Sequence, residues 1–297
     1  MNRNLVRGTA LCAALLLPST RAAVAQTTIF NSNGFEAGTF NTGNIHNQQG
    51  FQALPLTSAG SIQTATVFAG SRAFRINGPT TASNVPFGDV NFWYKPYTQA
   101  NTVNPVNLGT PHVQLSGQFR MSGNGATAFA DIPFAGFHFE GYYGGGANDT
   151  QMISSVYMAS DGRFMVLTTD GLEMFSTQTF GREQWHNVVA DFNFQAQTFR
   201  VFVNDQLLDF GGSPEVAFRN SFGQTQSIFE IGFEATWNSF TSAGGQNQFF
   251  IDDYHVTRSA VPYAPVPEPA ACLAVAGLAL AGYRRLRKRV TAAVPTP

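Results

Sequence analysis

The chain has almost no cysteine, and this absence limits how its folded part can be stabilised. Its two cysteines, Cys12 and Cys272, both lie in apolar segments near the termini. The region between these segments therefore contains no disulfide, so its stability must come from packing or from bound metal. With about 240 residues, this central region is long enough to bury a substantial core as one large domain.

The central region is also poor in basic residues. Eight of the 17 lysines and arginines lie in the two terminal segments, against one of the 18 acidic residues. The centre therefore carries 9 basic and 17 acidic residues, a formal charge of −8, and Lys95 is its only lysine. This charge argues against binding to nucleic acid and against adsorption to anionic membranes.

Several enzyme motifs are missing from the central region. It has no Gly-x-Ser-x-Gly nucleophile elbow, no glycine-rich phosphate loop and no cysteine nucleophile. Its five histidines have no metal-ligand spacing; they are His46, His112, His138, His186 and His255. No long stretch has a helical period, which argues against a helical fold.

The N-terminal residues have the pattern of a secretory signal peptide. Arg3 and Arg7 precede an apolar stretch, 8–18, and Ala23-Val24-Ala25 is a small-x-small cleavage site. We therefore expect residues 1–25 to be removed on export, with cleavage after Ala25.

The C-terminal segment has three parts. Val266-Pro267-Glu268-Pro269 is followed by an apolar run, 270–282, and by a basic cluster that begins with Arg284-Arg285. As a helix the run would be about 20 Å long, shorter than a hydrocarbon core of about 30 Å, so it suits transient insertion in the membrane. The basic cluster would hold its end on the cytoplasmic side. We assign 263–289 to this tail and 290–297 to a disordered end.

The order and spacing of these parts resemble the PEP-CTERM sorting signal of Gram-negative bacteria. The resemblance implies processing near Pro267-Glu268-Pro269 by an exosortase-type enzyme, and sorting to the cell envelope, the outer surface or the extracellular matrix. An ordinary C-terminal anchor is the alternative. It would explain the apolar run and the arginines but not the Pro-Glu-Pro sequence.

Short stretches of period two fill the central region, 26–262. They predict strands over 112–121, 134–139, 152–159, 163–169, 185–194, 198–204 and 206–210, with a short strand near 92–94. Asp161-Gly162 and Asn204-Asp205 predict hairpin turns. Many closely spaced strands without helices predict an all-β fold, an antiparallel β-sandwich.

Four segments resemble the concanavalin A-like sandwich in its laminin-G-like form. They are Trp185-His186-Asn187-Val188, Phe199–Asp205, Ile231-Gly232 and Phe250–Val256. The resemblance implies a jelly-roll β-sandwich of the lectin and glucanase type over 26–262. That fold hosts many activities, so the resemblance predicts architecture more firmly than function.

The start of the domain, Asn33-Gly34-Phe35-Glu36, is similar to the opening of jelly-roll carbohydrate-binding modules, whose closing strand also carries Ile-Asp-Asp. In those modules a carboxylate from each end helps to hold a structural calcium ion. The resemblance implies calcium held by Glu36 with Asp252 or Asp253, which would clamp both ends of the domain. The alternative is that these carboxylates face solvent at strand ends.

The segment Glu230-Ile231-Gly232-Phe233-Glu234 resembles the Glu-x-Asp-x-Glu strand of laminarinase-like glycoside hydrolases. There two glutamates act as nucleophile and general acid. Here glycine occupies the middle position and the segment lies too near the C-terminus. We therefore expect no enzyme activity, with glycoside hydrolysis through Glu230 and Glu234 as the alternative.

Sugar binding requires aromatic rings, because the apolar face of a pyranose stacks on them. Tyr142 and Tyr143 stand beside a glycine run, and Trp237 and Asn238 precede the last strand, so we expect them in exposed loops. The predicted function is non-catalytic contact with extracellular polysaccharide or biofilm matrix. A purely structural surface protein without a sugar ligand is a further alternative.

Overall fold

The computed structural model describes residues 26–54, 60–77, 89–97, 103–122, 134–144, 149–159, 161–168, 173–220, 222–237 and 248–265. Residues 26–263 form one compact unit. Other predictions fall outside the described residues: the signal peptide with Ala25, the end at 290–297, and the sorting tail with Val266, Pro267, Glu268, Pro269, Arg284 and Arg285. None of the helices in the described ranges is long and apolar enough to span a membrane.

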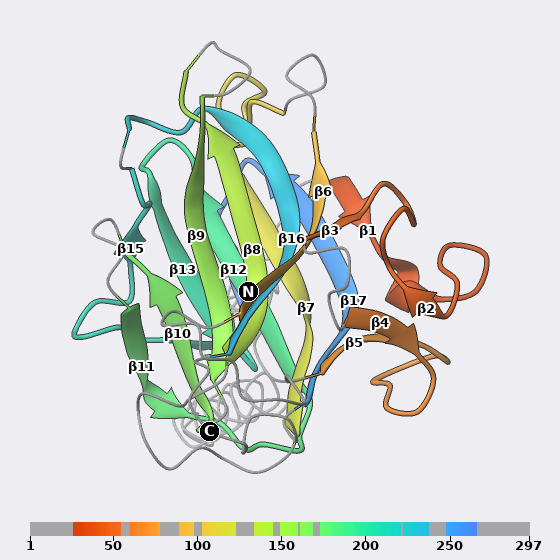
Figure 1. The fold of residues 1–297 in the computed structure, drawn as a ribbon. Coiled ribbons are helices and arrows are strands. Elements are labelled where there is room, and N and C mark those ends of the chain that lie inside the picture. Colours follow the sequence, from red (N-terminus) through yellow and green to blue (C-terminus); the bar gives the residue numbers. More distant parts are fainter. Residues whose placement is uncertain are drawn as a thin grey trace, which may run out of the picture. The chain divides into compact units, whose positions relative to one another are not determined.

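The described residues between 26 and 263 are built mainly from strands, which confirms the all-β prediction (Figure 1). In chain order they are β1 (Thr27–Asn31), β2 (Gly43–Asn44), β3 (Gln52–Leu54), β4 (Gly60–Gln63), β5 (Ala73–Asn77), β6 (Asp89–Pro96), β7 (His112–Ser122), β8 (Phe134–Tyr142), β9 (Thr150–Ala159), β10 (Arg163–Leu167), β11 (Glu173–Thr179), β12 (His186–Asn193), β13 (Thr198–Val203), β14 (Gln206–Leu207), β15 (Val216–Ala217), β16 (Ser227–Trp237) and β17 (Gln248–Ser259). A short 3-10 turn, Asn33–Phe35, follows β1.

The strands form two antiparallel sheets. Sheet A has the order β14-β13-β12-β7-β17-β5-β4-β2, with β1 beside β17 and β15 beside β13. Sheet B has the order β11-β10-β9-β8-β16-β6-β3. The first and last strands, β1 and β17, are therefore neighbours.

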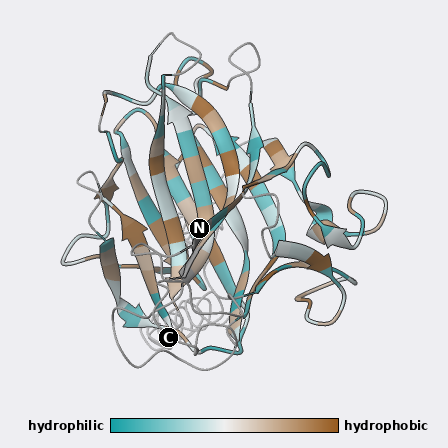
Figure 2. Cartoon of the chain, in the orientation of Figure 1, coloured by the Kyte–Doolittle hydropathy of each residue, from teal (hydrophilic) through white to brown (hydrophobic). Residues whose placement is uncertain are grey.

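Alternation along each strand separates a core face from an outer face (Figure 2). In β16, Ile231 and Phe233 are fully buried in the core between the sheets. Glu230, Gly232 and Glu234 therefore lie on the outer face of sheet B. Phenylalanines fill much of this core, and burial of each such side chain contributes about 1.5–3 kcal/mol.

The predicted hairpin turns are present. Gly162, between β9 and β10, has a φ of 88°, and a Cβ there would lie 2.3 Å from the carbonyl oxygen of Phe180. Asn204 and Asp205, between β13 and β14, have φ values of 50° and 64°. These turns therefore use residue types that tolerate a left-handed backbone.

Candidate functional site

Tyr142 does not lie in an exposed loop, so this prediction was wrong. It is the last residue of β8 and is 4% exposed. Its hydroxyl donates to the carbonyl oxygen of Tyr97 at 3.3 Å, and its ring packs against Phe229. Trp237 ends strand β16 opposite Asp89, whereas the sequence analysis placed it in a loop. Asn238 lies outside the described residues.

Tyr143 lies beside an exposed ring that the sequence analysis missed. The ring of Tyr143 stacks on that of Phe222, with centroids 5.5 Å apart and planes at 26°. Phe222 is 68% exposed and borders a pocket of about 370 Å³. The other lining residues are Glu140, Thr150, Gln151, Met152 and Arg219. We call this hollow the Phe222 pocket.

Gln151 holds the loop that carries Phe222. Its Nε2 donates to the carbonyl oxygen of Gly223 and to Oγ1 of Thr225, both at 2.8 Å. Its Oε1 accepts from the backbone amide of Phe222 at 3.2 Å. Because Gln151 is buried in β9, these bonds fix the exposed ring relative to sheet B.

Glu140 belongs both to this pocket and to a buried cluster on the outer face of sheet B. The cluster is centred on His138 of β8, which is fully buried. His138 Nε2 lies 3.0 Å from Oε1 of Glu230 and 3.3 Å from Oε1 of Glu140. Its Nδ1 lies 3.1 Å from Oε2 of Glu234. His138 is paired with Gly232 of β16, and this register places the imidazole between Glu230 and Glu234.

Glu234 is surrounded by donors. Its Oε2 accepts from the hydroxyl of Tyr157 at 2.6 Å and from that of Ser155 at 2.9 Å. Burial alone would raise the pKa of Glu234, but the hydrogen bonds from His138, Tyr157 and Ser155 hold it below its ordinary value. Glu234 is therefore ionised and fixed in place.

The other ionisable groups of the cluster respond to burial differently. Burial raises the pKa of Glu230, and the hydrogen bond with His138 offsets this only in part. Burial also opposes the charged form of His138, but hydrogen bonds to Glu140, Glu230 and Glu234 raise its pKa well above the ordinary value. One imidazole is thus shared among three glutamates.

The glycoside hydrolase pattern is not reproduced at this strand. A Cβ at Gly232 would lie 2.2 Å from the carbonyl oxygen of Trp93 in β6. The backbone of the neighbouring strand thus occupies the space that a middle aspartate would need. The group between Glu230 and Glu234 is instead His138, from a strand far away in the sequence.

The structure brings two of the three predicted calcium ligands together. Glu36 Oε1 accepts from the backbone amides of 71 and 72, and Asp252 Oδ2 accepts from those of 68 and 69. A Cβ on Gly34 would lie 3.4 Å from Oδ1 of Asp252 and 3.9 Å from Oε1 of Glu36. Both carboxylates therefore border the same small space.

Asp253 points elsewhere. It has a φ of 51° at an irregularity in the pairing of β17 with β7. Its Oδ1 lies 2.7 Å from Nε2 of His255, and both side chains are partly exposed. Of the two alternatives, only Asp252 faces Glu36, and burial raises the pKa of Asp252 to about 6.

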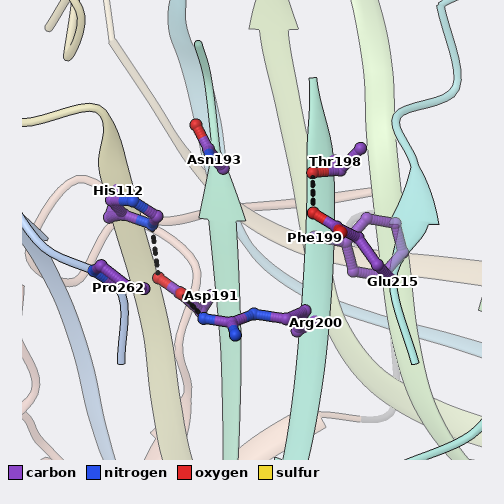
Figure 3. A pocket seen from close by; sticks show the side chains of 8 residues that line it. All are labelled: His112, Asp191, Asn193, Thr198, Phe199, Arg200, Glu215 and Pro262. Atoms are coloured by element: carbon purple, nitrogen blue, oxygen red, sulfur yellow. Dashed lines mark hydrogen bonds and ion pairs between the residues drawn. The ribbon is translucent and has the colours of Figure 1, made fainter. Parts of the chain in front are cut away.

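A second pocket, of about 230 Å³, lies on the outer face of sheet A (Figure 3). Asp191 of β12 is buried there, with Oδ2 at 3.0 Å from the guanidinium of Arg200 and at 3.1 Å from the backbone amide of Tyr263. His112 Nδ1 lies 3.3 Å from Oδ1 of Asp191. The sequence alone does not reveal this pocket, because its residues come from separate strands that only the register of the sheet brings together.

Fold and pockets define a two-sheet antiparallel β-sandwich with polar hollows on its outer faces. Residues 265–289 match the PEP-CTERM protein-sorting motif, which confirms the predicted sorting signal. The protein is therefore exported and sorted to the envelope, and the motif implies processing by an exosortase-type enzyme. The comparison with curated proteins gives no significant match.

Solved structures with a similar arrangement include carbohydrate-active and carbohydrate-binding proteins. An endo-β-1,4-glucuronan lyase from the fungus Trichoderma reesei is 14% identical, over 77% of this chain and 95% of that chain, with a TM-score of 0.45. The CBM22-1 xylan-binding domain from Paenibacillus barcinonensis is 14% identical, over 80% and 98%, with a TM-score of 0.40. A sialidase is 13% identical over 70% of this chain, which spans 17% of that protein, with a TM-score of 0.40. The activities belong to those proteins, and the likeness assigns none of them to this chain.

Proposed function

We propose that the protein binds extracellular polysaccharide at the Phe222 pocket without cleaving it. The observation that carries the proposal is the exposed ring of Phe222, stacked on Tyr143 at the edge of a polar hollow. A pyranose presents an apolar face to a ring and hydroxyl groups to polar side chains. The pocket offers both kinds of contact.

Two charged groups supply the polar contacts. Glu140 can accept hydrogen bonds from sugar hydroxyls, and its side chain is 24% exposed. The guanidinium of Arg219 contacts the sulfur of Met152 at 3.6 Å, and within the described part of the chain it has no carboxylate partner. Its remaining donors are available to a ligand. With one ring and two charged groups, we expect the pocket to bind a sugar unit weakly.

The arrangement of the glutamates supports binding rather than hydrolysis. In a glycosidase two carboxyl groups flank an open position for the scissile bond. Here the imidazole of His138 fills the space between Glu230 and Glu234, and both glutamates are buried. This arrangement supports the proposal that no glycosidic bond is cleaved between them.

A glycan array tests the proposal, with purified full chain in calcium and in chelator. We expect the wild type to retain one polysaccharide class and Phe222→Ala to lose it, because the stacking surface is gone. Phe68→Ala is the matched control, since Phe68 is 49% exposed and packs on Trp185 away from the pocket residues. Equal retention by Phe222→Ala and wild type would contradict the proposal.

Two alternative functions predict different results. Glycoside hydrolysis predicts release of reducing sugar from a polysaccharide panel, abolished by Glu230→Gln. A purely structural surface protein predicts an empty array together with self-association of the chain. We expect neither.

We also propose that calcium clamps the two ends of the domain, held by Glu36 and Asp252. Their carboxylates border one space beside segment 68–72, and calcium prefers several hard oxygen ligands. A chelator should lower the melting temperature of the wild type, and added calcium should restore it. Asp253→Asn should keep this response and Asp252→Asn should lose it. An unchanged melting temperature in chelator would reject the site.

We also propose where the protein acts. It acts at the outer envelope or in the extracellular matrix of a Gram-negative bacterium, after loss of residues 1–25. Before processing, the apolar run at 270–282 contacts the membrane. Fractionation of cells into cytoplasmic, envelope and secreted material tests this placement, and recovery of unprocessed chain in the cytoplasm would contradict it.

A further inference from the structure

Three side chains on adjacent strands of sheet B converge on one point. His138 and Glu140 lie on β8, and Glu230 lies on β16. Their nearest ligand atoms, one nitrogen and two carboxylate oxygens, all lie within 4.8 Å of one another. This set of donors has one imidazole and two carboxylates.

The cluster has too few protons for its acceptors. His138 Nε2 carries at most one hydrogen, yet Glu230 and Glu140 approach it at 3.0 and 3.3 Å. The described part of the chain provides no other donor to the Glu230 carboxylate, whose side chain is 8% exposed. A buried carboxylate with one shared donor is costly unless a further positive charge lies beside it.

The spacing suits a small metal ion. Zinc binds imidazole nitrogen and carboxylate oxygen at about 2.0–2.2 Å, so tetrahedral ligand atoms lie about 3.3–3.5 Å apart. The two separations from His138 Nε2 are within about 0.5 Å of that range. Small side-chain shifts therefore allow both carboxylates and the imidazole to bind one ion.

The other side of the imidazole is held as in many metal sites. A metal-binding histidine almost always donates its second N–H to a carboxylate or carbonyl, which fixes the tautomer and the ring orientation. Here His138 Nδ1 lies 3.1 Å from Glu234, and Tyr157 and Ser155 hold that carboxylate. This contact directs Nε2 toward Glu140 and Glu230.

We propose that His138, Glu140 and Glu230 bind a divalent transition-metal ion, which displaces the Nε2 proton of His138 to solvent, with Glu234 as the residue that positions the imidazole. A site with one nitrogen and two oxygen donors suits zinc, whereas calcium and magnesium prefer oxygen alone. Glu140 also lines the Phe222 pocket, so the ion enters from this side and faces any molecule bound there. The proposal does not depend on sugar binding.

Titration calorimetry with zinc chloride on chelator-treated full chain tests the site. We expect one zinc ion per chain, no binding to this site in His138→Ala, and about 10–100-fold weaker binding in Glu234→Gln, because an orienting partner is lost. The buried His138→Ala variant can fail to fold, so Glu140→Gln is a second test. The Glu140 side chain is partly exposed, so this change should disturb the fold least, and it should also weaken zinc binding.

Cobalt gives a second measurement that is independent of affinity. Bound Co²⁺ should show visible absorption bands that His138→Ala lacks. His255→Ala removes the exposed histidine–aspartate pair and should leave both measurements unchanged. The proposal is overturned if the wild type binds no stoichiometric metal, if folded Glu140→Gln and Glu234→Gln bind as the wild type does, or if binding depends on His255.

Discussion

Gly232 shows how closely neighbouring backbones approach in sheet B. A Cβ there would lie 2.2 Å from Trp93 O, and a main-chain atom in a central strand cannot move aside cheaply. We expect Gly232→Ala to lower the free energy of unfolding by about 1–3 kcal/mol, measured by urea denaturation. In Gly181→Ala the atoms nearest to the new methyl belong to the flexible side chain of Gln184, so the midpoint of this variant should stay near that of the wild type. Equal midpoints for both variants would disprove this account.

A second prediction concerns Asp191, which lines the pocket of Figure 3. Its buried carboxylate is shared by Arg200 and by the backbone amide of Tyr263. Asp191→Asn keeps the shape but removes the charge, and should cost about 1–3 kcal/mol of unfolding free energy. Asp161→Asn is the control: its pair with Arg163 is partly exposed and should contribute less than about 1 kcal/mol. Thermal unfolding of both variants measures the difference, and a larger loss in Asp161→Asn would contradict it.

Single residues also show what the sequence reveals of the site. The period of two places Glu230 and Glu234 on one face, and the structure confirms it. It cannot reveal His138, because the register between β8 and β16 joins residues 92 positions apart. The sequence does not predict the exposed ring of Phe222 for another reason. Its exposure depends on a loop held by Gln151, and a loop has no sequence period.

Asp252 links the last strand to the connection between β4 and β5. Its Oδ2 accepts from the backbone amides of Phe68 and Ala69. Asp252→Ala, measured in chelator, should therefore speed hydrogen exchange at these amides by about 10–100-fold. This factor corresponds to the loss of the free energy of one or two hydrogen bonds to a charged group. Asp253→Ala should leave them unchanged, because that side chain pairs with His255. Unaltered exchange in Asp252→Ala would show that other contacts hold the segment.

The predicted strand boundaries were wrong at the ends of some strands. The sequence placed Tyr142 at a loop because glycines follow it, yet β8 is a central strand, paired with β16 and β9 up to this residue. Pairing on both sides extends a strand beyond the point where its composition changes. β14 shows the opposite: it has one neighbour and ends at Leu207, although the sequence predicts a strand as far as 210. Tertiary pairing decides such boundaries, while turns such as Asn204-Asp205 follow from local chemistry.

The folded domain and the sorting signals differ in composition. The domain is acidic, free of cysteine and filled with phenylalanine, whereas the tail combines an apolar run with a basic cluster. Residues 26–263 also form a compact unit of their own. Changes in the tail should therefore alter the destination of the protein without altering the stability of the domain.

This separation leads to a prediction about sorting. Replacing Pro267, Glu268 and Pro269 by alanine removes the signature of the motif but keeps the apolar run and the basic cluster. We expect the variant to stay in the membrane fraction at full mass after loss of the signal peptide, because the run can still insert while the processing enzyme no longer recognises the junction. Immunoblots of cell fractions and intact-mass measurement check both points. Pro295→Ala with Pro297→Ala is the matched control, since these prolines follow the matched residues and should leave processing unchanged. Release of the triple variant at the wild-type mass would show that the Pro-Glu-Pro sequence is dispensable and would favour an ordinary anchor.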